Sequence, residues 1–407
     1  MAENIISGLD IGSAAIRIAV GQATPEGEIK ILGVAETKSE GVNKGIIVNL
    51  EDTVSSISGC LDKIEQVVGL PINRAYIGIS GTHIISQESR GVIAVSRADG
   101  EIKRDDVSRV LEVAQSMATP PNYEILHTLP RSFIVDNQPN IKDPVGMTGV
   151  RIEVEAQIIL GLNSQIKNLK KCLYRAGVNE EELVFTPLAC SEAILNKRQK
   201  ELGVLVINIG STTTSLAVFE EGDVLLAKVL PVGARYITND IAIGLRVPLD
   251  LAESIKIVHG SAYPSAVNKT EIINLKELSS SEEGTFPKKE VAEIIEARCE
   301  EIFKMADKEL QSINRSGKLP AGVILTGAGA HLSGLTELAK KVFKLPVSIG
   351  VPIGVTSEME KTFDPSFSTA VGLILWGRKM HGAGGHKSLS SGMNLGWMKK
   401  IFKNLFP

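Results

Sequence analysis

The segment VINIGSTT at residues 206–213 decides the fold, because a related segment, GLDIGS at residues 8–13, opens the chain. Each copy is an apolar strand that ends in Asp10 or Asn208, and Gly and hydroxyl residues then lead into a second strand rather than a helix. A tight turn of this kind exposes backbone N–H groups that can hold phosphate oxygens. One copy alone predicts only a β-hairpin with a glycine turn. Two copies about 200 residues apart predict phosphate sites in equivalent halves of the chain.

A third glycine-rich turn follows the apolar strand in VILTGAGA, residues 323–330, and precedes a helix expected at 333–343. Small residues there would let a flat base or ribose approach the backbone closely, although many strand-to-helix turns have a similar composition. An Asp at a strand end, as at Asp10, can hold a hydrated Mg²⁺ beside phosphates.

These three turns have the order and spacing of the phosphate and adenosine loops of the actin-like ATPase superfamily. Within it, the chain resembles the bacterial cell-division FtsA family over residues 5–378. The similar strings are FTPLACSEAILNKRQKELGVLVINIG, GARYITNDIAIGLRVPLDLAESIK, and KDPVGMTGVRIEVE in the inserted domain. The resemblance implies an α/β, actin-like fold of two ribonuclease-H-like lobes with ATP between them.

The resemblance also implies a division of the chain into parts. We expect a first lobe at 1–84, 166–200 and 364–379, an inserted α+β domain at 85–165, a second lobe at 201–363 with a subdomain at about 234–315, a linker at 380–395 and a terminal helix at 396–407. Periodicity predicts the order strand, helix, strand, strand in the inserted domain, one helix over 187–201 and a long helix over 288–312.

The resemblance assigns ATP and Mg²⁺ to particular residues. Asp10 would hold the magnesium, and Glu253 and Lys256, at i and i+3 of one helix, would border the adenosine. The full set of nucleotide-binding residues would be Asp10, Gly12, Ser13, Arg17, Asn208, Gly210, Ser211, Thr212, Thr213, Glu253, Lys256, Gly327, Gly329 and Ala330.

The chain departs from the family pattern at both phosphate loops. Ala14 and Ala15 follow Ser13 where the family has a Lys or a similar polar group, and Arg17 lies roughly 6.6 Å further along the same strand face. The second loop has Asn208 and Ser215 at positions where carboxylates are usual. Since an amide can neither act as a base nor give Mg²⁺ an anionic ligand, we expect ATP binding with at most weak hydrolysis.

Charge is distributed unevenly along the chain. The net charge is −3, which argues against nucleic acid as a partner, but residues 376–407 hold six Lys or Arg and no Asp or Glu. No apolar stretch is long enough for a transmembrane helix. The four cysteines, Cys60, Cys172, Cys190 and Cys299, form no CxxC pair and predict reduced thiols in a cytoplasmic protein.

The last twelve residues predict an amphipathic membrane helix. At about 100° per residue, its apolar side chains fall on one half of the helix and its lysines on the other. A terminal helix docked on the body is the alternative, against which the preceding Gly/Ser-rich stretch argues. The expected membrane residues are Trp397, Met398, Lys399, Lys400, Ile401, Phe402, Lys403, Leu405 and Phe406.

The resemblance implies a polymerising peripheral protein on the cytoplasmic face of the cell membrane at the division site. It would anchor filaments of the tubulin-like protein FtsZ, bind the acidic FtsZ C-terminal peptide and recruit other division proteins. Arg298 would contact that peptide, unless it pairs with Glu301 on its own helix. One alternative is a pilus-assembly platform of the same superfamily. Another is a small-molecule kinase with Asp240 as its base.

Overall fold

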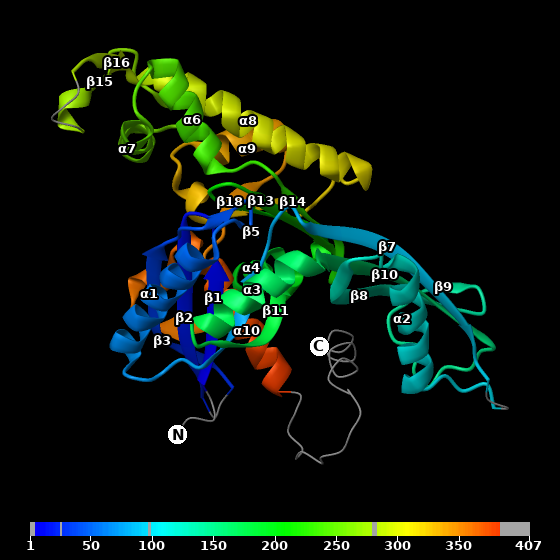
Figure 1. The fold of residues 1–407 in the computed structure, drawn as a ribbon. Helices are drawn as coiled ribbons and strands as arrows, with labels where there is room; N and C mark the ends of the chain where they lie inside the picture. Colours follow the sequence, from blue (N-terminus) through cyan, green and yellow to red (C-terminus); the bar gives the residue numbers. More distant parts are fainter. Residues whose placement is uncertain (1–4, 25–26, 97–98, 279–282, 383–407) are drawn as a thin grey trace.

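The computed structural model describes residues 5–24, 27–96, 99–278 and 283–382, which form two lobes and a smaller unit beside them (Figure 1). The first lobe contains a six-stranded sheet in the order β11-β6-β1-β2-β3-β19. Here β1, β2 and β3 form an antiparallel meander, and β6 lies parallel to β1. The strands are β1 (Ile5–Ile11), β2 (Ala15–Ala23), β3 (Ile29–Lys38), β6 (Arg74–Ile79), β11 (Asn179–Phe185) and β19 (Val355–Ser357).

The second lobe repeats this pattern in a five-stranded sheet with the order β14-β13-β12-β17-β18. Its meander is β12-β13-β14, and β17 lies parallel to β12. Each glycine turn joins the first two strands of its meander, so the duplicated two-lobed fold expected from the sequence is confirmed. The strands are β12 (Val204–Ile209), β13 (Thr214–Glu220), β14 (Asp223–Leu230), β17 (Val323–Thr326) and β18 (Val347–Ile349).

Helices cover the first sheet. The helix α1 begins after Asn49, whose side chain accepts a hydrogen bond from the Asp52 N–H, and it ends at Gly69 with φ +71°. The helices α4 and α10 pack closely, since a Cβ added at Gly372 would lie 1.9 Å from the Ala189 carbonyl oxygen. The helices are α1 (Leu50–Val68), α3 (Asn163–Arg175), α4 (Thr186–Ile194) and α10 (Ser368–Gly382), and a short pair, β4 (Val42–Asn43) and β5 (Ile46–Ile47), lies nearby in the chain. The short helix α5 (Lys197–Leu202) contacts β13 of the second sheet instead.

The expectation of one helix over 187–201 was wrong, because the chain forms α4 and α5 with a break at Leu195. Asn196 starts α5 as its N-cap, and its side chain accepts a hydrogen bond from the Gln199 N–H at 2.9 Å. The Asn196 N–H in turn donates to the Gln199 side-chain oxygen at 3.0 Å, which completes a capping box. This local pairing outweighs the helical periodicity that continues through the break.

The inserted domain is a four-stranded sheet, β7-β10-β8-β9, with α2 packed on one face. Its order is strand, helix and three strands, so the expected pattern lacked β9, a short strand that follows positive-φ residues Asp136 and Asn137. The elements are β7 (Ile84–Ala94), α2 (Arg104–Ala118), β8 (Tyr123–Val135), β9 (Gln138–Ile141) and β10 (Arg151–Leu162).

The remaining helices belong to the second lobe, where α6 and α8 lie side by side far from α1 (Figure 1). They are α6 (Ala234–Leu245), α7 (Leu249–His259), α8 (Lys288–Ser312) and α9 (Leu335–Phe343), with a small hairpin of β15 (Ile272–Asn274) and β16 (Thr285–Pro287). Short 3₁₀ turns occupy Pro264–Ala266, Leu275–Glu277, Ala328–His331, Glu360–Phe363 and Pro365–Phe367. The long helix expected over 288–312 is confirmed as α8.

One strand crosses the expected lobe boundary. Val355–Ser357 pairs with β3 in the first sheet, although residues up to 363 were expected in the second lobe. Among the described residues, no helix combines the length and the apolar character needed to cross a membrane. The terminal helix expected at 396–407, with all its membrane residues, lies outside the described residues, as does most of the expected linker.

Candidate nucleotide site

A cavity of about 1020 Å³ lies between the two lobes and is lined by both glycine turns, α6, α7 and the third turn. Thirteen of the fourteen nucleotide-binding residues expected from the sequence line it. The exception is Ala330, which is 5% exposed and packs in the core of the second lobe. The cavity-lining members are Asp10, Gly12, Ser13, Arg17, Asn208, Gly210, Ser211, Thr212, Thr213, Glu253, Lys256, Gly327 and Gly329.

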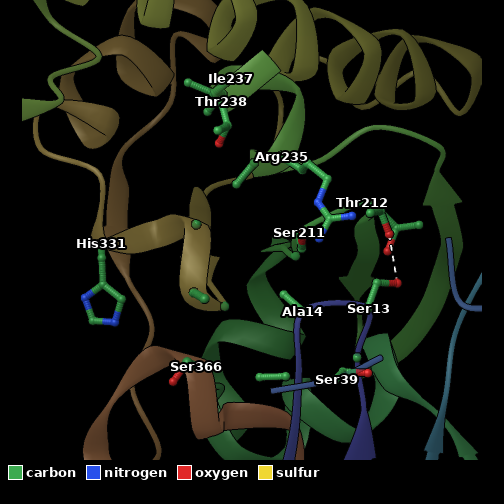
Figure 2. Close-up of a pocket in the computed structure, with 18 of the residues that line it drawn as sticks. Ser13, Ala14, Ser39, Ser211, Thr212, Arg235, Ile237, Thr238, His331 and Ser366 are labelled. Atoms are coloured by element: carbon green, nitrogen blue, oxygen red, sulfur yellow. Dashed lines mark hydrogen bonds between the residues drawn. The ribbon is translucent and has the colours of Figure 1, made fainter. Parts of the chain in front are cut away.

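The two phosphate-loop candidates have the same backbone geometry. The Gly12 N–H donates to the Ala15 carbonyl at 3.2 Å, and the Gly210 N–H donates to the Thr213 carbonyl at 2.9 Å. A Cβ at Gly12 would lie 2.7 Å from that Ala15 oxygen, so glycine is required by close backbone approach. The loops meet across the cavity, where the Thr212 hydroxyl donates to the Ser13 hydroxyl at 2.9 Å (Figure 2).

Asp10 is the second-last residue of β1 and lies opposite Arg17 in the β1–β2 ladder. Burial raises the pKa of Asp10 to about 6, and the positive charge of Arg17 opposes this shift. A carboxylate that is desolvated and lines a cavity beside a phosphate-loop candidate fits a Mg²⁺ site, because a nearby divalent cation would favour its ionised form.

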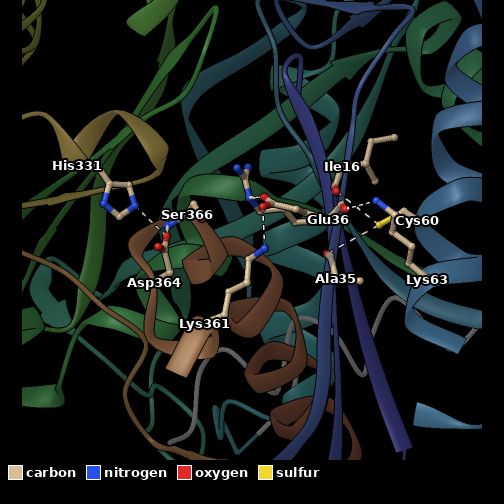
Figure 3. Close-up of polar contacts among 10 residues, drawn as sticks. Ile16, Ala35, Glu36, Cys60, Lys63, His331, Lys361, Asp364 and Ser366 are labelled. Atoms are coloured by element: carbon tan, nitrogen blue, oxygen red, sulfur yellow. Dashed lines mark hydrogen bonds and ion pairs between the residues drawn. The ribbon is translucent and has the colours of Figure 1, made fainter. Parts of the chain in front are cut away.

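Arg17, two residues beyond Ala15, lines the cavity and is engaged by a carboxylate of the first lobe. Its Nε donates to Glu36 Oε2 at 3.1 Å, and its guanidinium group lies 5.8 Å from the centre of the Phe367 ring. Glu36 is held in turn by Lys361 at 2.8 Å (Figure 3). These neighbours lower the pKa of Glu36 despite its partial burial, which keeps it ionised as the partner of Arg17.

Asn208 is the second-last residue of β12 and faces Ser215 across the β12–β13 ladder. Its Nδ2 donates to Thr369 Oγ1 at 3.2 Å, and the Ser215 and Ser80 hydroxyls lie 3.2 Å apart. Both side chains are therefore held by hydroxyl groups, and neither offers a carboxylate to the cavity. This arrangement is compatible with the expected weak hydrolysis, which stays a prediction.

The helix face shared by Glu253 and Lys256 forms a compact polar group with Thr238. Lys256 Nζ lies 2.7 Å from Glu253 Oε2 and 2.9 Å from Thr238 Oγ1, and the Thr238 hydroxyl also donates to Glu253. In the third turn, Gly327 has φ +84°, and a Cβ there would lie 2.2 Å from Asn208 Oδ1. At Gly327 the cavity wall is therefore formed by backbone atoms without a side chain.

Sequence reasoning missed several cavity residues. Thr238 and Arg235 stand within the quoted segment 233–256, but nothing in their spacing distinguished them from other residues of α6. His331 lies in the cavity wall and pairs with Asp364 at 3.0 Å (Figure 3). Ser366 and Thr369 come from a segment with no recognisable motif, so only the fold identifies them.

Arg298, expected to dock a partner peptide, lies outside this cavity on α8. Its Nε and Nη2 donate to the two carboxylate oxygens of Asp240 at 2.6 and 2.9 Å, and its Nη1 pairs with Glu301. The expected pairing with Glu301 is therefore present. Asp240 is engaged by Arg298 and does not line the cavity, which argues against the kinase alternative.

Comparison with known protein families identifies the chain. The model described as cell division protein FtsA matches residues 205–372, and the model of the SHS2 domain inserted in FtsA matches residues 81–160. The cell division protein FtsA of Pseudomonas aeruginosa is 35% identical over 95% of this chain and 92% of its own length. That of Bacillus subtilis is 39% identical over 90% of this chain and 82% of its own length.

The chain belongs to the FtsA family. Solved structures with low sequence identity support the actin-like fold that FtsA shares. A type IV pilus biogenesis complex of PilM and PilN matches with a TM-score of 0.67 and 16% identity over 92% of this chain and 98% of that chain. MreB5 of Spiroplasma citri bound to ADP matches with a TM-score of 0.54 and 12% identity over 91% of this chain and 95% of that chain. The FtsA relatives decide against the pilus-assembly alternative, because the pilus match supports the fold alone.

Proposed function

We propose that this FtsA-family chain binds ATP with Mg²⁺ between its lobes, polymerises, and tethers FtsZ filaments to the cytoplasmic face of the membrane at the division site. The cavity lined by both glycine turns carries the proposal, since it has the donors and the shape that a nucleotide needs in one place. An ADP-bound MreB5 with the same fold lends further support.

Different residues of the cavity would bind different parts of Mg·ATP. Backbone N–H groups at the Gly12 and Gly210 turns would hold phosphate oxygens, and Asp10 would hold the magnesium, which neutralises phosphate charge. Gly327 and Gly329 would let the base lie against the backbone, and Lys256 would reach the adenosine from α7. Without a carboxylate at Asn208 or Ser215, the site favours binding over turnover.

The tethering part of the proposal depends on two other regions. The sequence of residues 396–407 supplies an amphipathic basic segment suited to anionic lipid. Arg298 on α8 would contribute charge-assisted hydrogen bonds to the acidic C-terminal peptide of FtsZ, in competition with Asp240 and Glu301. Recruitment of other division proteins would follow from the same position at the membrane.

A co-sedimentation experiment tests this function. FtsZ filaments should pellet with anionic vesicles only when the full chain and Mg·ATP are present. FtsZ that pellets equally well without the chain, or with the chain lacking residues 396–407, would contradict the tether. Direct titration with a fluorescent ATP analogue tests the nucleotide site separately.

A further inference from the structure

Among the residues that the structure describes, five side chains that can carry positive charge line the cavity between the lobes. Four of them have a carboxylate partner in the structure. These pairs are Arg17 with Glu36 at 3.1 Å, Lys38 with Glu40 at 3.0 Å, Lys256 with Glu253 at 2.7 Å, and His331 with Asp364 at 3.0 Å. Arg235 is the fifth, and within the described part of the chain its guanidinium group has no such partner.

The backbone of Arg235 is fixed to the second phosphate loop. Arg235 is the second residue of α6, and its N–H donates to the Ser211 carbonyl at 2.7 Å, while the Ala234 N–H donates to the Gly210 carbonyl at 2.9 Å. A Cβ at Gly233 would lie 2.6 Å from that Gly210 oxygen, so the helix start and the loop are in close contact. Any movement of the loop therefore carries Arg235 with it.

The side chain of Arg235 points toward the phosphate end of the cavity. Figure 2 shows it extending from α6 toward Ser211 and Thr212, whereas His331 stands on the far side of the cavity. The Thr212 hydroxyl bonds Ser13 at 2.9 Å, so the guanidinium group is directed to the place where the two loops meet. The third turn contributes Gly327 and Gly329 to the same cavity, and it packs against Asn208 and Ile209 at the end of β12.

We infer that Arg235 binds the terminal phosphate of a nucleoside triphosphate and sets the preference for triphosphate over diphosphate, an inference that rests on the proposed nucleotide site. The first loop has Ala14 and Ala15 in place of a cation, and Arg17 is held by Glu36. A planar guanidinium group can make two parallel hydrogen bonds to phosphate, which suits a terminal group with three free oxygens. In this chain the cation would therefore come from the second lobe.

Nucleotide titrations of the full chain test this role. Arg235→Gln should weaken binding of Mg with the β,γ-imido analogue of ATP by roughly tenfold or more, the size expected for one charge-assisted phosphate contact. Binding of Mg·ADP should change less than about threefold, because the lost contact is to the terminal phosphate. The affinity of Arg235→Lys for the ATP analogue should fall between the affinities of the unmodified chain and of Arg235→Gln. Arg198→Gln, an exposed arginine on α5 outside the cavity, is the matched control.

The outcomes of these titrations distinguish a failure of the role proposed for Arg235 from a failure of the nucleotide site. Equal weakening for the two nucleotides, or no change for either, would overturn the role of Arg235 while leaving the nucleotide site intact. Absence of binding by the unmodified chain would overturn the proposed function and this inference together. Arg235 is exposed, so the variants should keep the melting temperature of the unmodified chain, and a lower one would assign the residue a structural role instead.

Discussion

Asn208 and Ser215 lie directly opposite each other in the β12–β13 ladder, at the edge of the cavity. These are the two positions of the second loop at which the resemblance to FtsA leads one to expect carboxylates. Asn208 donates to Thr369, and Ser215 pairs with the Ser80 hydroxyl. The two positions that lack a carboxylate therefore form one cross-strand pair. As a result, negative charge is absent from one place in the cavity, beside the proposed phosphate site.

Slow ATP turnover follows from this pair. We expect phosphate release well below about 1 s⁻¹ at saturating Mg·ATP, under the usual range for enzymes. Asn208→Asp should raise the rate, because it restores a group that can orient or deprotonate water. Asn239→Asp, on α6 in the same cavity, adds the same charge elsewhere and is the control. A rate of several per second in the unmodified chain would show that these carboxylates are not needed.

The ionisation of Asp10 should destabilise the fold at neutral pH. Burial raises its pKa from 3.8 to about 6, so the folded state holds the proton more tightly than the unfolded chain does, and stability falls as pH rises from about 4 to about 6. Asp10→Asn should remove this cost, which is about 3 kcal/mol at about 1.4 kcal/mol per pKa unit. Its melting temperature, without nucleotide or magnesium, should exceed that of the unmodified chain at pH 7 and match it at pH 4.

The same Asp10→Asn variant should lose Mg·ATP binding, since it lacks the anionic ligand. Asp62→Asn, an exposed change on α1, is the control and should alter neither property. An Asp10→Asn protein that is no more stable at pH 7 would show that the carboxylate is already compensated in the folded state.

Alanine at Gly327 should be more costly than alanine at another glycine with positive φ. Gly327 has φ +84°, and an added Cβ would lie 2.2 Å from Asn208 Oδ1. Gly354 has φ +74° with nothing within 4 Å of its added Cβ, so it reports the backbone cost alone. We expect Gly354→Ala to lower the free energy of unfolding by about 1 kcal/mol and Gly327→Ala to lower it clearly more, as measured by denaturant unfolding. Equal costs would exclude the contact with Asn208 as a constraint.

Arg298 and Asp240 should control peptide docking in opposite directions. Asp240 occupies the guanidinium group of Arg298 with two hydrogen bonds and raises the pKa of Arg298. Asp240→Asn should therefore remove one of the two carboxylates that compete for Arg298 and strengthen binding of the acidic FtsZ peptide, whereas Arg298→Glu should weaken it by about tenfold. Lys341→Glu, at the Lys341–Glu296 pair between α9 and α8, is the charge-matched control. Unchanged affinity for Arg298→Glu would remove this residue from the docking site.

Residues 396–407 should anchor the chain to anionic vesicles. One such segment binds weakly, so co-sedimentation should rise steeply with protein concentration as polymerised subunits hold on together. Deletion of the segment should abolish pelleting, and Phe402→Glu on the apolar half should reduce it more than Asn404→Glu on the polar half. Pelleting of the deleted chain under non-polymerising conditions would place the anchor elsewhere.

Elements with strong local signals were predictable. The amphipathic pattern of α8 marks Lys288–Ser312 from end to end. The strands β9 and β19 are only 4 and 3 residues long and were not anticipated, since strands so short depend on a partner rather than on their own pattern. The break between α4 and α5 was missed because a capping box interrupts a periodicity that continues across it.

The sequence by itself determined the two glycine turns, the strands around them and the charges absent at Ala15, Asn208 and Ser215, because each depends on neighbours along the chain. It could not show which cation remains available in the cavity. Arg17 is taken by Glu36 on the next strand, and Lys361 joins that pair from 325 residues beyond Glu36. Only the tertiary structure shows that Arg235 extends toward the phosphate loops and has no carboxylate partner among the described residues, since ion pairing is decided by side chains that meet in space.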